Sequence, residues 1–372
     1  TCPDRFAAVK DAFAANFTDA PEGLDELAAR FSVCIGGETV IDLWAGDADA
    51  AKTTPFTDQS LVPVFSTGKV VMSLMIATLV ERRLVTYDTP VAEVWPAFGQ
   101  AGKDRITLGQ MMSHQAGLPG FDQTVDPAVW FDREAVLERL AAQAPMWEPG
   151  AASGYHPITI GYLAGEVFRL LDGRTMGTAL REDFAEPFGL DLWIGLPEDQ
   201  HGRVAQLKKP SAAPDLGTID AVKKAAFLDR GSAPGGRGST EWRKMEIPSA
   251  NMHARADALA RIMGVLANGG TLDGETILSP ETLADATRER IHGPDRVLPF
   301  TIPWAAGWMR NEGLAIFGPN PETLGHCGWG GSCAMADPVT NLSAAYVMTR
   351  QSPHLIGDPR ATRLLEALYA VL

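Results

Sequence analysis

Residues 64–70 decide how this chain is interpreted, and they read Val64-Phe65-Ser66-Thr67-Gly68-Lys69-Val70. They run directly into the apolar stretch 71–80, VMSLMIATLV, which is typical of a buried helix. A lysine at the head of such a helix either reaches out to water or performs a chemical task. Residues three positions apart lie on the same face of a helix, so the Lys69 side chain can reach the Ser66 hydroxyl.

The surroundings of this lysine favour a chemical role. An ammonium held against apolar side chains is poorly solvated, and desolvation lowers the pKa of a lysine until a neutral amine can accept a serine proton. The N-terminus of the helix adds a partial positive charge that favours a developing anion. The alternative is that Ser66 caps the helix and Lys69 is a solvated residue of its first turn. The S-x-x-K spacing alone does not decide between these two interpretations.

Length and composition indicate the class of protein. A chain of 372 residues is too long for one ordinary core, so we expect two domains. Contents of 45% hydrophobic and 21% charged residues are typical of a soluble globular protein. The formal net charge of −14 argues against nucleic acid and anionic membranes as partners, because binding to phosphates requires a basic patch.

The sequence predicts neither a membrane span nor a disulfide framework. The apolar run from Val70 to Val80 is bounded by charged residues and is shorter than the roughly 18 residues that a bilayer crossing needs. The four cysteines include no CxxC pair, and they are few for so long a chain. We therefore expect a cytoplasmic protein, although a start at Thr1 without methionine is compatible with a trimmed N-terminal segment.

Strand-like segments lie near both ends of the chain, and helical segments fill its middle. A hairpin is expected where two β-rich runs flank Gly36-Gly37. The segments expected to be regular are helices over 6–17, 158–172, 257–268 and 359–372, and strands over 31–35, 39–44, 305–310, 331–336 and 343–349. Residues 208–240 are rich in Gly, Pro, Ala and Ser and predict a long surface loop.

This order of elements predicts an α+β protein with two parts. One sheet is built from both ends of the chain, and a mainly helical domain is inserted between them. We expect residues 1–85 and 240–372 to form the α/β domain, and residues 86–239 to form the helical domain with the long loop 208–240. The cleft between the two parts is the expected site.

Two further segments agree with a chemical role for Ser66 and Lys69. Gly154-Tyr155-His156-Pro157 precedes the helix expected over 158–172, and Gly325-His326-Cys327-Gly328-Trp329-Gly330-Gly331-Ser332 precedes two strand-like runs. Together with S-x-x-K, these segments resemble the motifs of the serine β-lactamase and penicillin-binding-protein superfamily. Within it the closer match is to the family VIII carboxylesterases, which are similar to class C β-lactamases.

The resemblance covers nearly the whole chain in the right order. Residues 110–119 resemble the family segment LLSHTSGLP, residues 186–197 resemble PLGL…W.GLP, and residues 247–251 resemble IPAAN. The resemblance implies a β-lactamase/transpeptidase-like fold, in which a mixed antiparallel sheet is flanked by helices and carries an inserted, mainly helical domain.

The resemblance also implies a role for each motif residue. Ser66 would attack a carbonyl and become acylated, and Lys69 would accept or share its proton. Tyr155, as a phenolate or through a hydrogen bond to Lys69, would assist this step and the activation of water in deacylation. Oxyanion and substrate binding would fall to the backbone of Ser66 and to the third-motif segment, here His326, Gly328, Trp329 and Gly330.

Two departures from the penicillin-recognising members bear on the substrate. Where those members often carry an asparagine that binds the substrate amide, this chain has Pro157, and where they carry a lysine that binds a carboxylate, it has His326. Both differences favour a neutral ester. We therefore predict a carboxylesterase that cleaves short-chain esters through an acyl-enzyme on Ser66. The alternatives are a β-lactamase, a D-amino acid peptidase or amidase, and a penicillin-binding protein that acylates without turnover.

Other chemistries fit the sequence less well. An α/β-hydrolase needs G-x-S-x-G, and the segment around Ser66 lacks the first glycine. A metal site on His326, Cys327 and Cys333 is disfavoured, because the histidines form neither H-x-H nor H-E-x-x-H. We expect no metal and no cofactor, and a small-molecule ester as substrate, while the sequence leaves the oligomeric state open. The two cysteines are expected to be small buried residues, and His114 and His156 to be structural hydrogen-bonding groups.

Overall fold

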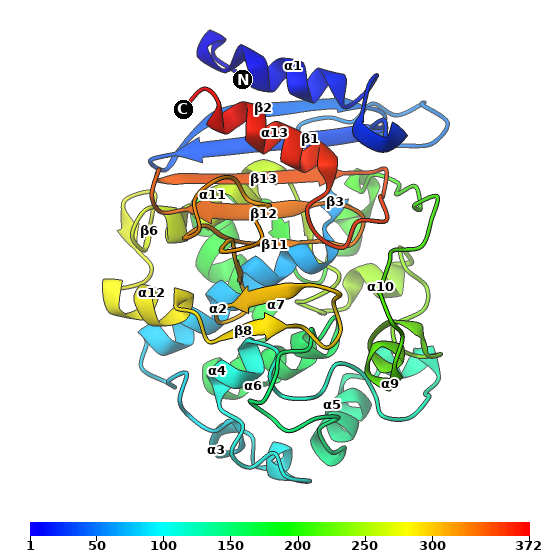
Figure 1. The fold of residues 1–372 in the computed structure, drawn as a ribbon, viewed down its shortest axis with the longest axis vertical. Helices are drawn as coiled ribbons and strands as arrows, with labels where there is room; N and C mark the ends of the chain where they lie inside the picture. Colours follow the sequence, from blue (N-terminus) through cyan, green and yellow to red (C-terminus); the bar gives the residue numbers. More distant parts are fainter.

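The computed structural model describes residues 1–372, and its largest element is an eight-stranded sheet (Figure 1). The strands follow the order β2-β1-β13-β12-β11-β10-β9-β8, and each neighbouring pair is antiparallel. Their bounds are β1 Ala28–Ile35, β2 Glu38–Gly46, β8 Ile291–Pro294, β9 Thr301–Trp304, β10 Met309–Arg310, β11 Leu324–Cys327, β12 Cys333–Asp337 and β13 Leu342–Met348. Two small sheets accompany it, β3-β5-β4 (Val62–Pro63, His253–Ala254, Leu192–Trp193) and β6-β7 (Thr271–Leu272, Glu275–Thr276).

The two ends of the chain meet inside the large sheet. The first hairpin pairs with the last strand, so that Ala29 of β1 lies opposite Met348 of β13 and Ile35 lies opposite Leu342. This antiparallel sheet with its covering helices confirms the predicted α+β, β-lactamase/transpeptidase-like fold. The division of the chain at residues 85/86 and 239/240 stays a prediction.

Strand β1 is buried on both faces, because helices cover both sides of the sheet. Alternate residues of a strand point to opposite faces. Phe31 and Val33 share one apolar cluster with the helices α1 (Ala7–Ala15) and α13 (Pro359–Tyr369), whereas Ala28 and Cys34 belong to the cluster that includes α11 (Ala256–Ala267). Thus the alternating side chains of β1 pack against two different layers of helices, one on each face of the sheet.

Helix α2 (Lys69–Glu81) runs through the centre of the molecule and is apolar on all sides. A helix without a polar face is stable only when protein surrounds it, and α2 contacts both α11 and α6 (Thr159–Asp172). Gly173 ends α6 in the left-handed conformation, as the sequence predicts. The remaining helices are α3 Val91–Val94, α4 Leu108–Met112, α5 Arg133–Ala142, α7 Met176–Leu180, α8 Glu186–Phe188, α9 Ala221–Lys223, α10 Thr240–Lys244 and α12 Pro280–Thr287.

The expected long loop over 208–240 contains helical structure. Helix α9 continues into one π-helical segment, η8 (Lys224–Leu228), whose Ala225 and Ala226 are buried. The composition of the segment does not predict this helical structure, because the segment is ordered by a contact with residues that are distant in sequence. A Cβ on Gly120 would lie 2.0 Å from the carbonyl oxygen of Ala225, so only glycine lets the two backbones approach so closely.

The expected single strand over 305–310 is also wrong in its bounds. The structure has β9 and β10 on either side of a turn at residues 305–308. In that turn Gly307 has a φ of +94°, and a Cβ there would lie 2.0 Å from Ser73 Oγ of α2. The chain reverses at this point because it packs directly against the central helix.

Candidate active site

Ser66 lies in the short 3₁₀ turn η3 (Phe65–Gly68), which leads directly into α2. The regular α-helix begins only at Lys69, so Ser66 does not cap it. Phe65, immediately before the serine, has a φ of +49°, which costs a non-glycine residue on the order of 1–3 kcal/mol. Its buried ring packs against Trp242 at a centroid distance of 6.2 Å. The strained backbone thus presents the Ser66 side chain to the pocket.

Lys69 is completely buried and is surrounded by oxygen atoms. Its Nζ lies 3.0 Å from Ser66 Oγ, 2.8 Å from the Tyr155 phenolic oxygen, 2.8 Å from the Pro157 carbonyl oxygen and 2.9 Å from the Ser249 carbonyl oxygen. Burial lowers the pKa of Lys69 well below its ordinary value, because water no longer solvates the cation. The solvated first-turn lysine that the sequence left open is therefore wrong.

The four oxygen atoms around Lys69 determine how the N–H groups and the lone pair of a neutral amine are oriented. The carbonyls of Pro157 and Ser249 only accept hydrogen bonds, so they take the two N–H groups of a neutral amine. The nitrogen lone pair then faces the hydroxyls of Ser66 and Tyr155. In this form Lys69 can accept a proton from either hydroxyl, which is the requirement for a general base.

Tyr155 completes a closed triangle of contacts. Its hydroxyl donates to Ser66 Oγ over 2.6 Å. Burial raises the pKa of the Tyr155 phenol above its ordinary value, and the hydrogen bond with Ser66 offsets only part of this shift. Burial disfavours the charged form of both Tyr155 and Lys69, so it favours a neutral phenol beside a neutral amine.

Asp295 and Trp304 hold Tyr155 in place. The buried carboxylate of Asp295 accepts the Tyr155 backbone N–H over 2.9 Å, and it also accepts the backbone N–H groups of the loop residues Val297 and Leu298. The indole N–H of Trp304 donates to the second oxygen of Asp295 over 3.3 Å. The Trp304 ring stacks parallel on the Tyr155 ring at 6.0 Å. The sequence carried no motif for Asp295.

The backbone N–H groups of Ser66 and Trp329 are among those beside the pocket that have no hydrogen-bond partner within the protein. The carbonyl oxygen of Gly330, next to Trp329, accepts from Ser352 over 2.9 Å, and this contact holds the loop. On the other side of Trp329, a Cβ on Gly328 would lie 2.3 Å from the Val64 carbonyl oxygen. These two free donors can stabilise a negative oxygen placed between them.

His326 is a neutral group in this pocket. Its Nδ1 lies 2.7 Å from the Cys327 carbonyl oxygen, so Nδ1 carries the hydrogen and Nε2 is an acceptor. Nε2 is buried and has no partner. Burial lowers the pKa of His326 to about 3, and a proton on the nearby Lys69 would be a smaller cause in the same direction. The third motif therefore supplies no positive charge at neutral pH.

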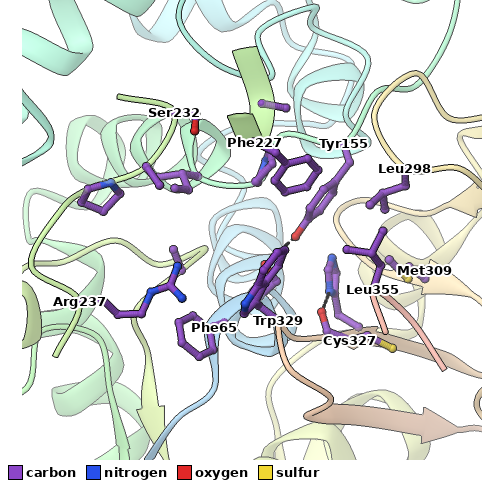
Figure 2. Close-up of a pocket in the computed structure, with 18 of the residues that line it drawn as sticks. Phe65, Tyr155, Phe227, Ser232, Arg237, Leu298, Met309, Cys327, Trp329 and Leu355 are labelled. Atoms are coloured by element: carbon purple, nitrogen blue, oxygen red, sulfur yellow. Dashed lines mark hydrogen bonds between the residues drawn. The ribbon is translucent and has the colours of Figure 1, made fainter. Parts of the chain in front are cut away.

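A largely apolar pocket of about 210 Å³ opens above Ser66 (Figure 2). Of the residues expected at the site, Ser66, Tyr155, His326 and Trp329 line it, Lys69 lies directly beneath Ser66, and the backbones of Gly328 and Gly330 flank Trp329. Much of the apolar wall went unpredicted. It comprises Phe65, Ile158, Ala226, Phe227, Trp242, Leu298, Met309 and Leu355.

The neighbouring histidines and cysteines have structural roles, as the sequence indicates. His156 accepts the Leu118 backbone N–H at Nε2 over 2.9 Å, and His114 Nδ1 accepts the His156 backbone N–H over 3.1 Å. These bonds shape the loop that carries Tyr155. Cys327 and Cys333 are buried, unbridged and opposite each other on β11 and β12.

No group of three or more His, Cys, Asp or Glu side chains is arranged to hold a metal ion. None of the helices combines the length and apolarity that a bilayer crossing requires.

This fold and this cluster of serine, lysine and tyrosine define a serine hydrolase of the β-lactamase-like class. The Beta-lactamase family model matches residues 13–369, and the chain belongs to that family. Among characterised relatives, it is similar to the "Esterase/beta-lactamase LipL" of Mycobacterium tuberculosis, with 37% identity over 95% of this chain and 83% of that protein.

Solved structures of the same fold lie close to this one. A penicillin-binding protein homologue from Caulobacter crescentus is 56% identical, with a TM-score of 0.97 over 100% of this chain and 99% of that one. A family VIII carboxylesterase is 37% identical, with a TM-score of 0.92 over 100% of this chain and 98% of that one. EstA from Arthrobacter nitroguajacolicus Rue61a is 28% identical, with a TM-score of 0.86 over 100% of this chain and 97% of that one.

Proposed function

We propose that this serine hydrolase is a carboxylesterase that cleaves short-chain esters. The observation that carries the proposal is the triangle of Ser66, Lys69 and Tyr155 at the floor of an apolar pocket. The pocket accommodates a small acyl or alkyl group, and its floor holds a nucleophile beside a desolvated amine. The similarity to a family VIII carboxylesterase and to an esterase/β-lactamase supports the same activity.

Acylation follows from the contacts of Ser66. Its Oγ attacks the ester carbonyl carbon while its proton passes to the neutral amine of Lys69. The carbonyl oxygen becomes an oxyanion, which accepts hydrogen bonds from the free backbone N–H groups of Ser66 and Trp329. The C–O bond then breaks, and the leaving alcohol takes its proton through the Tyr155 hydroxyl, which Lys69 re-protonates. The acyl group remains on Ser66 as an ester.

Deacylation uses the same groups with water as the nucleophile. Water gives a proton to the Lys69–Tyr155 pair and attacks the acyl carbonyl carbon, and the same two backbone N–H groups receive the oxyanion. When the bond to Ser66 Oγ breaks, the serine recovers a proton from the pair. The enzyme returns to its starting state, and the carboxylic acid leaves.

Two residues at the pocket favour esters over β-lactams. Pro157 offers no side-chain amide to bind the amide of a penicillin, and its carbonyl is already occupied by Lys69. His326 is neutral, so it does not replace the lysine of the penicillin-recognising motif. A β-lactamase, or a penicillin-binding protein that acylates without turnover, is the second candidate, since the Caulobacter crescentus structure is that of a penicillin-binding protein homologue.

A substrate panel separates the candidates. We expect p-nitrophenyl acetate and butyrate to be turned over steadily, with a higher kcat/KM than a chromogenic cephalosporin, a D-amino acid amide or the longer p-nitrophenyl octanoate. A better kcat/KM for the cephalosporin would instead identify a β-lactamase. A single burst of p-nitrophenol, equal to the enzyme concentration and followed by no turnover, would identify an acylating protein that does not hydrolyse its acyl-enzyme.

A further inference from the structure

One arginine at the rim of the pocket has no function in the mechanism above. Arg237 belongs to the glycine-rich residues 231–238 and lines the pocket together with Ser66. Its guanidinium carbon lies 5.0 Å from the centre of the Phe65 ring, which is a cation–π arrangement. Since Phe65 directly precedes Ser66, this contact fixes the positive charge close to the nucleophile. Figure 2 shows the guanidinium directed toward Phe65 and Trp329, on the opposite side of the pocket from Leu298 and Met309.

The guanidinium of Arg237 has no protein partner. It forms no ion pair, and none of its N–H groups donates to a side chain or a carbonyl oxygen, which leaves the Phe65 ring as its contact. By contrast, Arg230 of the same segment pairs with Asp126 at 3.1 Å. Five N–H donors in a planar fork are therefore available at the rim of the pocket.

Nothing in the pocket neutralises this charge. No aspartate or glutamate lines it, and Arg237 is its only residue with a permanent charge. The side chain is exposed at the rim, yet the surrounding pocket atoms displace part of its water and lower its pKa. An arginine stays protonated even so, because its ordinary pKa is above about 12. In a chain with a net charge of −14, an unpaired cation beside the nucleophile is a local exception.

We propose that Arg237 binds a carboxylate on the substrate, so that the preferred esters carry an acid group besides the ester bond. This inference rests on the proposed esterase function. The sequence favours a neutral substrate because His326 replaces a lysine, but a loop on another side of the pocket brings in a different cation. A guanidinium matches the two oxygens of a carboxylate with parallel hydrogen bonds.

Matched pairs of esters test this binding. On the alcohol side, the pair is 3-acetoxybenzoate and 3-acetoxybenzamide, which differ by a charge and are similar in shape. On the acyl side, the pair is the phenyl monoester of adipic acid and the phenyl ester of adipic acid monoamide. The pair that shows the larger preference for the acid over the amide in kcat/KM identifies whether the alcohol or the acyl part of the substrate contacts Arg237.

Three variants accompany the wild type. Arg237→Gln removes the charge, Arg237→Lys keeps the charge without the fork, and Arg230→Gln removes a charge from the same segment outside the pocket. We expect wild type to prefer the acid of one pair about tenfold in kcat/KM, and Arg237→Gln to lose that preference. Arg237→Lys should retain part of it and Arg230→Gln all of it. High salt should reduce the preference, because the site is exposed.

Binding to a variant that cannot be acylated separates this inference from the esterase proposal. In Ser66→Ala, calorimetry should give a tighter Kd for the acid than for the amide, and Ser66→Ala/Arg237→Gln should bind both equally. Equal binding of acid and amide by Ser66→Ala would overturn the role of Arg237, whatever the turnover. Retained preference in binding without turnover of any ester would support Arg237 as an anion site and overturn the esterase proposal alone.

Discussion

The side-chain nitrogen of Lys69 lies 2.8 Å from the phenolic oxygen of Tyr155, and both groups contact Ser66 Oγ. Burial disfavours the charged forms of both residues, so neither is fixed as an ion beside the serine. The lone pair of the neutral Lys69 nitrogen can therefore accept the proton that Ser66 loses when it attacks. The three predictions on Ser66, on the pair and on its support depend on this contact.

Replacement of the proposed nucleophile gives the first prediction. Ser66→Ala removes Oγ but leaves the pocket, so ester hydrolysis should fall by a factor on the order of a thousand or more. Mass spectrometry after treatment with an organophosphonate should place the adduct on Ser66. Ser211→Ala, which changes an exposed serine in the segment 208–240, should keep full activity and the same adduct. An adduct on another residue, or an active Ser66→Ala enzyme, would reject the mechanism.

The pH dependence gives the second prediction. The protonated form of Lys69 cannot accept the serine proton, so the rate should rise with pH through the pKa of Lys69, and because burial lowers this pKa the acidic limb should lie well below the ordinary lysine pKa. Tyr155→Phe keeps the ring but removes the hydroxyl that returns the proton to the leaving alcohol. Its kcat should fall strongly across the whole pH range.

Double variants show whether Lys69 and Tyr155 act as a unit. The loss in kcat for Lys69→Ala combined with Tyr155→Phe should be much smaller than the product of the two single losses. Lys69→Arg should be inactive as well, because an arginine stays protonated. If Tyr155→Phe kept nearly full kcat with the same acidic limb, Tyr155 would be only a wall of the pocket.

Removal of the support behind Tyr155 gives the third prediction. Asp295→Asn preserves the shape of the side chain but loses the charge that accepts three backbone N–H groups and the Trp304 indole. The free energy of unfolding should fall by about 1–3 kcal/mol. The kcat should fall about tenfold to a hundredfold with little change in KM, because the Tyr155 hydroxyl moves relative to Ser66.

Asp11→Asn is the control for Asp295→Asn, because it removes the same charge from an exposed position on α1. It should change neither the melting temperature nor kcat. A purely structural role for Asp295 would lower the melting temperature and the amount of folded enzyme while leaving kcat per folded molecule intact. That outcome would contradict its role in positioning Tyr155.

A methyl group on the oxyanion loop gives the fourth prediction. Gly330 has a φ of +92°, and a Cβ there would lie 2.8 Å from the Gln351 side chain, so Gly330→Ala should displace the adjacent Trp329 N–H. Loss of one oxyanion donor lowers kcat by about a hundredfold. Gly313→Ala has a similar φ of +74° with no atom within 4 Å of the new Cβ. It should cost on the order of 1 kcal/mol of stability and leave kcat unchanged.

The sequence alone was enough to propose Ser66, Lys69, Tyr155 and Trp329 as site residues, because their relations are local or carried by motifs. Ser66 and Lys69 are three residues apart on one helical turn, and the segments around Tyr155 and Trp329 have the spacing of a known family. The hairpin at Gly36-Gly37 and the end of α6 at Gly173 were predictable for the same reason, since glycine conformations are local.

The tertiary structure alone decided what surrounds these residues. Ser249 lies in the segment 247–251 that resembles a family motif, but it contributes only a carbonyl oxygen, which every residue possesses, so its identity does not predict the contact with Lys69. Asp295 and Arg237 act from segments far from Ser66 in sequence, and their importance comes from what faces them: three backbone N–H groups in one case, and no partner at all in the other. A residue's identity fixes its possible contacts, but burial and distance select among them, and both depend on how the whole chain packs.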